Sequence, residues 1–212
     1  MIRILLLFFV LLSTADAQAL NVPLESYFTL EEIKAAQTAA DHPKMKDTEK
    51  QMVTVLNLVR LYPKKFAREY LPAVVKKAEY IEVSAAYEEL VKELLNGEPL
   101  EPLSPDDFLS KHAQIHAKDM GRSGQAGHNS SGGKTFNMRM APMQKRYSGV
   151  AENCQYGFKD AAEIVVDLLI DDGIPERGHR RNILDPAFNL IGVSVEPHKK
   201  FDVNCVQIFG VL

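Results

Sequence analysis

The chain has 212 residues, of which 25 are Lys or Arg and 28 are Asp or Glu, so its formal net charge is −3. A strongly basic surface would indicate a nucleic-acid partner, and with this slightly acidic balance we expect none. The hydrophobic content of 46% is sufficient for the core of one large domain, with or without an extension.

The N-terminus has the pattern of an export signal. Arg3 precedes an apolar run over residues 4–12, and Ala15 and Ala17 match the small-x-small pattern of a cleavage site. The run is shorter than the roughly 20 residues that span a bilayer. We therefore predict that residues 1–17 are a signal peptide and that the mature chain has no transmembrane segment, with a retained N-terminal anchor as the alternative. The predicted location is secreted, either extracellular or periplasmic.

The chain after the signal divides into a weakly patterned and a strongly patterned part. Residues 18–45 show no clear hydrophobic period, and we interpret them as an N-terminal extension that packs loosely or not at all. Residues 46–212 form the predicted domain, in which apolar residues recur at helical spacing from Asp47 onward. Further helices are expected to begin at Ser84 and at Ser104, the latter an N-cap followed by proline.

The last third of the chain mixes helix and strand. Asp160 is followed three residues later by a glutamate, which predicts the start of an apolar helix that ends at Gly173. A short strand is expected over residues 148–157, and two more over 188–197 and 201–210 form a predicted hairpin. Helices followed by a small antiparallel sheet with an interposed helix indicate the α+β class.

Two cysteines, Cys154 and Cys205, both fall in predicted strands. In an exported chain an even pair favours a disulfide over two free thiols. Such a bond would close a loop of about fifty residues and stabilise the fold by ~3–4 kcal/mol. We therefore predict a Cys154–Cys205 disulfide. A thiol nucleophile at Cys154, paired with a histidine, is the less favoured alternative.

Three stretches place an acid or a histidine in a loop or at a strand edge: AGHNSSGG with His128, VAENCQYG with Glu152, and RGHRRNIL with His179. The helix between the last two ends in Asp171 and Asp172. Carboxylates at a helix C-terminus oppose the macrodipole at a cost of ~0.3–1 kcal/mol each, so we expect a nearby cation to compensate them. We also expect the arginines of the RGHRR stretch to anchor this turn to an acid such as Asp172.

Taken in order, the motifs GH, EN, GHR-NIL and VQ-FG resemble those of the CAP superfamily. The superfamily is named after cysteine-rich secretory proteins, antigen 5 and pathogenesis-related class-one proteins, and its domain is also called the SCP domain. The resemblance covers residues 46–212 and is closest to secreted bacterial members. It implies an α+β fold, an α-β-α sandwich with a small central antiparallel sheet. It also implies a binding or signalling role, because no general enzymatic reaction is established for the family.

The resemblance further implies a cleft lined by two histidines and two acids. His128 matches the first histidine, Glu152 the acid of the EN motif, and His179 the second histidine. The fourth position, usually a glutamate near the end of the intervening helix, falls on Asp171 or Asp172. We favour Asp171, since it shares a helical face with the apolar residues three and seven positions before it.

Two imidazoles and two carboxylates can hold a divalent ion such as Zn²⁺ and leave positions open to water, with His128 and His179 as the metal-binding imidazoles. Without metal, a carboxylate paired with a histidine can orient a general base. Glu152 is equally consistent with a buried structural acid. The first hypothesis is a secreted module that binds an extracellular lipid, glycan or protein, or a metal, in this cleft. The alternative is a peptidase- or esterase-like hydrolase that uses the same cleft.

Two other patterns carry weaker signals. The stretch HAQIH puts His112 and His116 at the i, i+4 spacing of zinc metalloproteases, but Ala113 stands where those enzymes carry the glutamate base. We interpret this helix as structural. Ser130 and Ser131 lie beside the first motif histidine without a nucleophile elbow, so we expect them to shape a turn.

Overall fold

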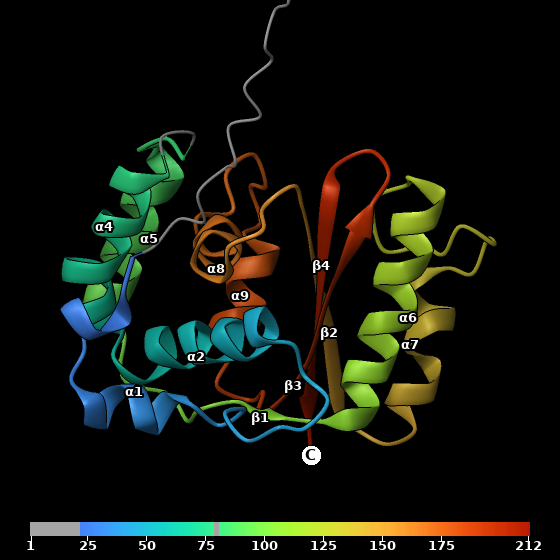
Figure 1. Cartoon of the computed structure of the whole chain (residues 1–212), viewed down its shortest axis with the longest axis horizontal. Helices are drawn as coiled ribbons and strands as arrows, with labels where there is room; N and C mark the ends of the chain where they lie inside the picture. Colours follow the sequence, from blue (N-terminus) through green and yellow to red (C-terminus); the bar gives the residue numbers. More distant parts are fainter. Residues whose placement is uncertain (1–21, 79–80) are drawn as a thin grey trace, which may run out of the picture.

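The computed structural model describes residues 22–78 and 81–212, so the predicted signal peptide lies outside the described residues. One four-stranded sheet lies between two groups of helices (Figure 1). Its strands run in the order β1-β3-β4-β2, with the bounds β1 Ser104–Pro105, β2 Gly149–Tyr156, β3 Leu190–His198 and β4 Asp202–Val211. The α+β class and the layered sandwich are therefore confirmed.

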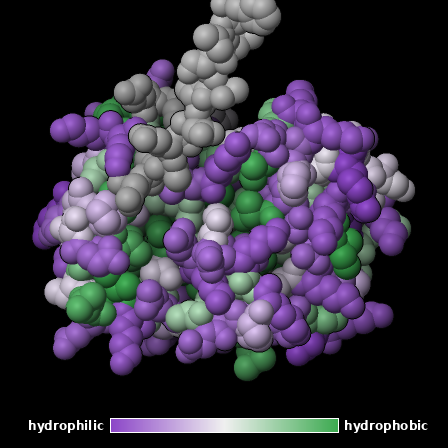
Figure 2. Space-filling model, viewed as in Figure 1, coloured by the Kyte–Doolittle hydropathy of each residue, from purple (hydrophilic) through white to green (hydrophobic). Residues whose placement is uncertain are grey.

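The two faces of the sheet are covered by different helices (Figure 1). One face packs against α6 (Asp107–Ser123) and α7 (Phe136–Gln144), and the other against α2 (Asp47–Leu61), α8 (Ala161–Ile170) and α9 (Gly178–Leu184). The other described helical segments are η1 (Leu24–Ser26), α1 (Leu30–Ala36), α3 (Pro63–Lys65), the π-helical η2 (Phe66–Tyr70), α4 (Leu71–Lys77) and α5 (Ala85–Asn96). Apolar residues are buried on both faces, while Figure 2 shows a mostly hydrophilic surface with small hydrophobic patches.

The sheet agrees with the predicted hairpin and adds one parallel strand. β3 and β4 pair antiparallel, as do β2 and β4, whereas β1 pairs parallel with the start of β3. β1 contains Ser104, which was expected to cap a helix. That expectation is wrong, because the carboxylate of Asp106 accepts the N–H groups of Phe108 and Leu109 and caps α6 two residues later. Backbone pairing with β3 takes precedence over the local capping signal.

The N-terminal extension contributes to the core, so the expectation that it packs loosely is wrong. α1 begins with a capping box, in which Thr29 and Glu32 each accept the backbone N–H of the other. The apolar side chains of the extension that are buried in the same core as α2 are Val22, Phe28, Ile33, Ala36, Ala39 and Met45. The segment changes direction several times, and its buried residues therefore follow no single period.

The predicted disulfide is absent, and the register of β2 against β4 explains why. Cys154 lies opposite Val206, whereas Cys205 lies opposite Gln155. Residues that lie opposite each other in an antiparallel pair point to the same face, and successive residues point to opposite faces. The two thiols are therefore on opposite faces of the sheet, and both are free and buried. Cys205 packs toward α2, where its Sγ lies 3.5 Å from Sδ of Met52.

Close packing of α6 on β3 depends on glycine. A Cβ atom added at Gly192 would lie 2.2 Å from the backbone carbonyl carbon of Leu109 and from the backbone nitrogen of Ser110. At the other end of α6, a Cβ at Gly121 would lie 2.1 Å from the carbonyl oxygen of Pro197. The helix thus approaches the strand closely at both ends, and no other residue type fits at either position without movement of the backbone.

We predict that Cys154 and Cys205 remain thiols in the purified protein. Burial raises the pKa of both groups, so the native protein should react slowly with iodoacetamide. After denaturation without reductant, intact-mass analysis should show both thiols alkylated. A peptide that contains the two cysteines joined by a disulfide would contradict the observed register.

We predict that Gly192→Ala lowers the free energy of unfolding by roughly 1–3 kcal/mol, the usual cost of overpacking. Urea denaturation at neutral pH measures the change. Gly132→Ala is the matched control, since the nearest atom to its added Cβ is Ser130 Oγ at 4.0 Å, and we expect a change within about 0.5 kcal/mol. Equal effects of the two substitutions would contradict the importance of the close approach.

Candidate functional site

Glu152 is the centre of the first of two histidine–carboxylate pairs. It lies on β2, is 5% exposed, and its side chain meets α7 and the loop that follows α6. Arg139 of α7 binds both carboxylate oxygens, at 2.8 Å to Oε1 and 2.6 Å to Oε2. His128 Nδ1 lies 2.9 Å from Oε1. An ionised carboxylate can only accept, so Nδ1 donates to Oε1, and Nε2 is the ring nitrogen that Glu152 does not contact.

The loop that carries His128 is fixed by contacts on both sides. The C-cap of α6 is Gly124 in the left-handed conformation, with φ 74°, and Gly127 also has a positive φ of 112°. The backbone N–H of Gly127 donates to the Tyr156 hydroxyl, and its carbonyl accepts from His116 Nε2, both at 2.8 Å. Strand β2 and helix α6 therefore hold the residue before His128 in place.

The electrostatics of Glu152 combine two opposing effects. Burial alone would raise the pKa of the Glu152 carboxyl, but the hydrogen bonds from Arg139 and His128 outweigh it and hold the pKa below its ordinary value. Glu152 is thus a charged group in the interior, compensated by a guanidinium whose side chain is 9% exposed. A carboxylate paired in this way both orients an imidazole and ties β2 to α7.

Asp171 and His179 form the second pair. Asp171 is the C-cap of α8 in the left-handed conformation, with φ 53°, and it is 4% exposed. One of its oxygens accepts the backbone N–H of His179 at 2.8 Å, and the other lies 2.7 Å from His179 Nδ1. Asp172 is exposed, and its carboxylate accepts the N–H of Gly173 instead. Of the two candidate acids, Asp171 is the one that contacts the histidine.

Buried arginine holds the His179 turn, but through acids other than the expected Asp172. Arg180 is 1% exposed and donates to Glu89 and Glu93 of α5, at 3.0 and 3.2 Å. It also donates to backbone carbonyls at the end of α8 and the start of α5. Arg177 likewise binds Glu89 and the carbonyl of Asp171. The expectation that Asp172 anchors this turn is therefore wrong.

The two pairs flank the edge strand β2. Glu152 points to the face covered by α7, whereas the next residue, Asn153, donates to the carbonyl of His179 on the other face. Among the described residues, no hydrogen bond or ion pair links one pair to the other. A cavity of about 220 Å³ beside His179 is lined by Cys154 and Gln155, which point to opposite faces, and so it reaches around the edge of β2.

Three residues near the pairs were not among the predicted site residues. Arg139 has no motif around it, and nothing in the sequence marks it as the partner of Glu152. His116 was assigned to a structural helix, yet its Nε2 lies 3.9 Å from Glu152 and burial lowers its pKa. Asp167 lines the cavity beside His179, and burial raises its pKa. A lone acid in the apolar stretch IVVDLLI was the available signal for Asp167.

Two groups of side chains carry atoms that bind metal ions in other proteins. Ligand atoms of His116, Glu152 and Cys154 lie within 4.8 Å of one another. Arg139 occupies both oxygens of that carboxylate, and burial raises the pKa of the thiol, so a cation is disfavoured there. The imidazoles of His128 and His179 are arranged differently. Each is held at Nδ1 by a buried carboxylate, the arrangement in which Nε2 commonly binds zinc.

Comparison with known proteins identifies the class. The family model for CAP, the cysteine-rich secretory protein family, matches residues 55–209. The chain therefore belongs to this family, and both histidine–carboxylate pairs lie within the matched region.

Among curated relatives, the uncharacterized protein YkwD of Bacillus subtilis (strain 168) is 37% identical over 114 residues. The match includes 51% of this chain and 42% of that protein, so this chain spans less than half of its length. Two solved structures are similar at low identity. An outer surface protein from Borrelia burgdorferi is 22% identical with a TM-score of 0.44, over 59% of this chain and 88% of that one. An extracellular protein containing a SCP domain from Bacillus anthracis str. Ames is 21% identical with a TM-score of 0.43, over 65% and 43%.

Within residues 22–78 and 81–212, no helix combines the length and the apolar character that a membrane crossing requires.

We predict that Arg139→Met lowers the free energy of unfolding at pH 7 by about 3–5 kcal/mol, because it leaves the buried carboxylate of Glu152 without its guanidinium partner. In the wild type the lowered pKa of Glu152 contributes stability that is lost as the pH falls through it. In the variant burial raises that pKa, so the stability of the variant is lost as the pH rises. The difference in the free energy of unfolding between wild type and variant should therefore decrease as the pH is lowered from 7 to about 4.

Urea denaturation at several pH values measures this difference. The exposed Arg122, which has no bidentate carboxylate partner among the described residues, provides the control variant Arg122→Met, with an expected change within about 0.5 kcal/mol. If the difference in the free energy of unfolding between wild type and Arg139→Met does not vary with pH, Glu152 is not the source of the lost stability.

Proposed function

We propose that the chain is an exported binding module of the CAP family whose two histidine–carboxylate pairs form a Zn²⁺-dependent ligand site. The observation that carries the proposal is that Asp171 and Glu152 each hold an imidazole at Nδ1, so that Nε2 of His179 and of His128 is left as the metal-binding nitrogen. His128 is 42% and His179 22% exposed at the side chain, so both rings are accessible to an ion and to a ligand from solvent.

In this proposal the carboxylates orient the imidazoles and do not bind the ion themselves. Ionised Glu152 and Asp171 favour the tautomer with the proton on Nδ1 and make each ring a stronger donor to a cation. A shared ion requires the two Nε2 atoms to lie within roughly 3–4 Å, given Zn–N distances of ~2.0–2.1 Å. The remaining coordination positions would be available to water or to an extracellular lipid, glycan or protein.

A hydrolase that uses the same pairs is the second candidate, and one observation favours it. The carboxylate-oriented imidazole of His179 beside a cavity is also the geometry of a general base. The described residues offer it no activated nucleophile, however. The Ser131 hydroxyl donates to Asp119, and the Ser130 hydroxyl accepts the N–H of Lys134. The raised pKa of Cys154 keeps its thiol protonated, although its Sγ lies 3.7 Å from His128 Nδ1.

Calorimetric titration of the metal-free protein with Zn²⁺ tests the proposal. We expect Asp171→Asn to weaken zinc binding by about 10–100-fold, the usual cost of removing an orienting carboxylate. His128→Ala and His179→Ala should each cause a larger loss, because each removes a metal-binding nitrogen. Loss in only one of the two histidine variants would exclude a shared ion, and wild-type affinity in both would exclude the zinc site.

Two controls sharpen this experiment. Asp172→Asn removes the adjacent exposed acid, which does not contact His179, and should leave the affinity unchanged. His112→Ala removes an imidazole outside the two pairs and should also have no effect. The same variants are then tested with peptide and ester substrates. Hydrolysis by the wild type that is lost in His179→Ala would favour the hydrolase over the binding module.

A further inference from the structure

The outer surface of α6 and α7, here called the α6–α7 face, is strongly basic. Residues 108–146 contain seven Lys or Arg residues and one acid, Asp119, in a chain whose net charge is −3. One of the seven, Arg139, is neutralised by Glu152. The other six are exposed and form no ion pair with a described carboxylate: Lys111, Lys118, Arg122, Lys134, Lys145 and Arg146.

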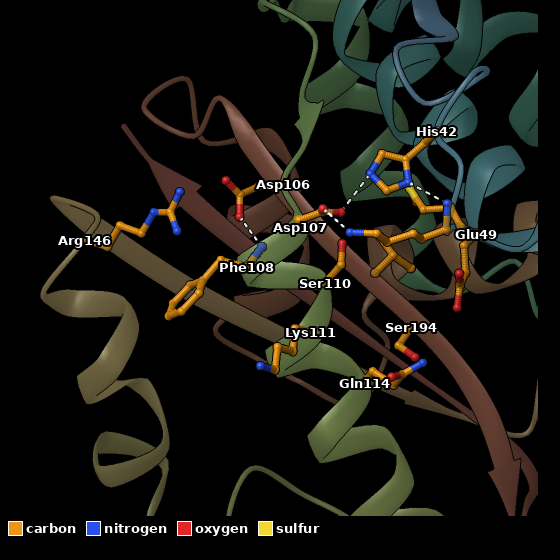
Figure 3. Close-up of a pocket in the computed structure, with 13 residues that line it drawn as sticks. His42, Glu49, Asp106, Asp107, Phe108, Ser110, Lys111, Gln114, Arg146 and Ser194 are labelled. Atoms are coloured by element: carbon orange, nitrogen blue, oxygen red, sulfur yellow. Dashed lines mark hydrogen bonds and ion pairs between the residues drawn. The ribbon is translucent and has the colours of Figure 1, made fainter.

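The acids within this face or at its border are held by other groups. The carboxylate of Asp119 accepts both the backbone N–H and the hydroxyl of Ser131. At the first turn of α6, Asp107 binds Lys44 at 2.6 Å and His42 at 3.1 Å (Figure 3). Asp106 caps the same helix. These acids reduce the charge at the start of α6 but leave the rest of the face with a net positive charge.

Helical spacing places cations and exposed apolar side chains together in two stripes. The stripe on α6 consists of Lys111, Ile115, Lys118 and Arg122, and the stripe on α7 consists of Met138, Pro142 and Lys145. Residues three or four positions apart lie on the same side of a helix, and all seven residues are exposed. Ile115 is 55% and Met138 is 60% exposed. None of these residues belongs to the two histidine–carboxylate pairs.

A groove of about 440 Å³ separates the two stripes. Its apolar rim is exposed and includes Ile115, Met138 and Pro142. Its buried lining is mainly polar, since the His116 side chain is 1% exposed and that of Arg139 is 9% exposed. An apolar ligand that filled the groove would therefore cover polar groups. A surface laid across the rim would instead contact the apolar side chains and the cations together.

We propose that the α6–α7 face docks on a membrane surface rich in anionic lipid headgroups. No described element covers the outer side of these two helices (Figure 1). The exposed Lys and Arg side chains bind the headgroup phosphates, and Ile115 and Met138 enter the apolar side of the interface. Interfacial amphipathic surfaces combine these same two contacts.

Two other occupants fit the face less well. A soluble acidic polymer would pair with the cations but would leave Ile115 and Met138 in water. A partner helix placed in the groove would bury its apolar side chains against the polar groups of His116 and Arg139. Only a surface that is both anionic and apolar uses the exposed cations and the exposed apolar side chains at once.

Sedimentation with vesicles tests the proposal on the mature chain, residues 18–212, from which the apolar run of residues 4–12 is absent. We expect the protein to bind vesicles of equal parts phosphatidylglycerol and phosphatidylcholine, but not vesicles of phosphatidylcholine alone. Binding should weaken as the ionic strength rises from about 0.1 to about 1 M, because the Debye length falls from about 10 to about 3 Å. Equal binding to the two kinds of vesicle would overturn the proposal.

Charge variants locate the docking surface. Lys118→Gln combined with Arg122→Gln should weaken binding to the anionic vesicles by about 25-fold, or roughly fivefold for each cation. The matched control combines Lys34→Gln with Lys92→Gln, which removes two exposed cations from α1 and α5. This control should bind as the wild type does. Equal losses in the two double variants would show that net charge alone matters, and would contradict a defined face.

Apolar variants separate a membrane from an acidic macromolecule. Ile115→Gln and Met138→Gln should each weaken vesicle binding by about fivefold, because each removes an apolar side chain from the interface. Leu30→Gln is the control, at a position of α1 that is 77% exposed, and should have no effect. Unchanged vesicle binding in both face variants would overturn the proposal. Tighter binding to soluble polyglutamate than to the vesicles would also overturn it, in favour of an acidic macromolecule.

Discussion

The close approach of α6 to the sheet positions the loop that carries His128. Gly192 and Gly121 remove the side chains that would separate helix from strand, at one end and at the other. With α6 held against β3, its first turns line a cavity of about 540 Å³ together with β3 and residues 42–49. Its last turn delivers the loop that carries His128 to Glu152 on β2. A helix displaced by even one methyl group would change the distance between donor and acceptor at both ends.

Buried arginines also hold the segments that carry the site residues in place. Arg139 neutralises Glu152, and Arg180 holds the turn that carries His179 through two carboxylates and three backbone carbonyls. Arg60 has a similar role. It lies on α2, is fully buried, and donates to four backbone carbonyls in the segments before β1 and β3. Burial lowers the pKa of Arg60 to about 10. Losing one partner of such a group costs more than an apolar contact does, so these segments have little freedom to move.

Local patterns in the sequence were sufficient for several of the elements and for the motif residues, but not for strand β1, for the packing of the N-terminal extension or for the partners of the motif residues. The hairpin of β3 and β4 and the start of α8 at Asp160 follow from alternation and capping, and both are confirmed. The disulfide failed because Cys154 and Cys205 face opposite sides, and a shift of one residue in register reverses that outcome. Arg139 could not be found for a related reason. Its role depends on where α7 lies against β2, and no local pattern of the sequence encodes that tertiary distance.

The proposed shared site of the two histidine–carboxylate pairs depends on the edge position of β2. Glu152 and Asn153 point to opposite faces, and in a central strand the sheet itself would separate His128 from His179. Because β2 has no neighbour on its outer side among the described strands, side chains from both faces can meet around its edge, where the cavity beside His179 is lined by residues of both orientations. A shared ion would join the loop after α6 to the turn before α9 at this edge. The site would then couple two segments that the described hydrogen bonds leave separate, and ligand affinity would depend on the metal that joins them.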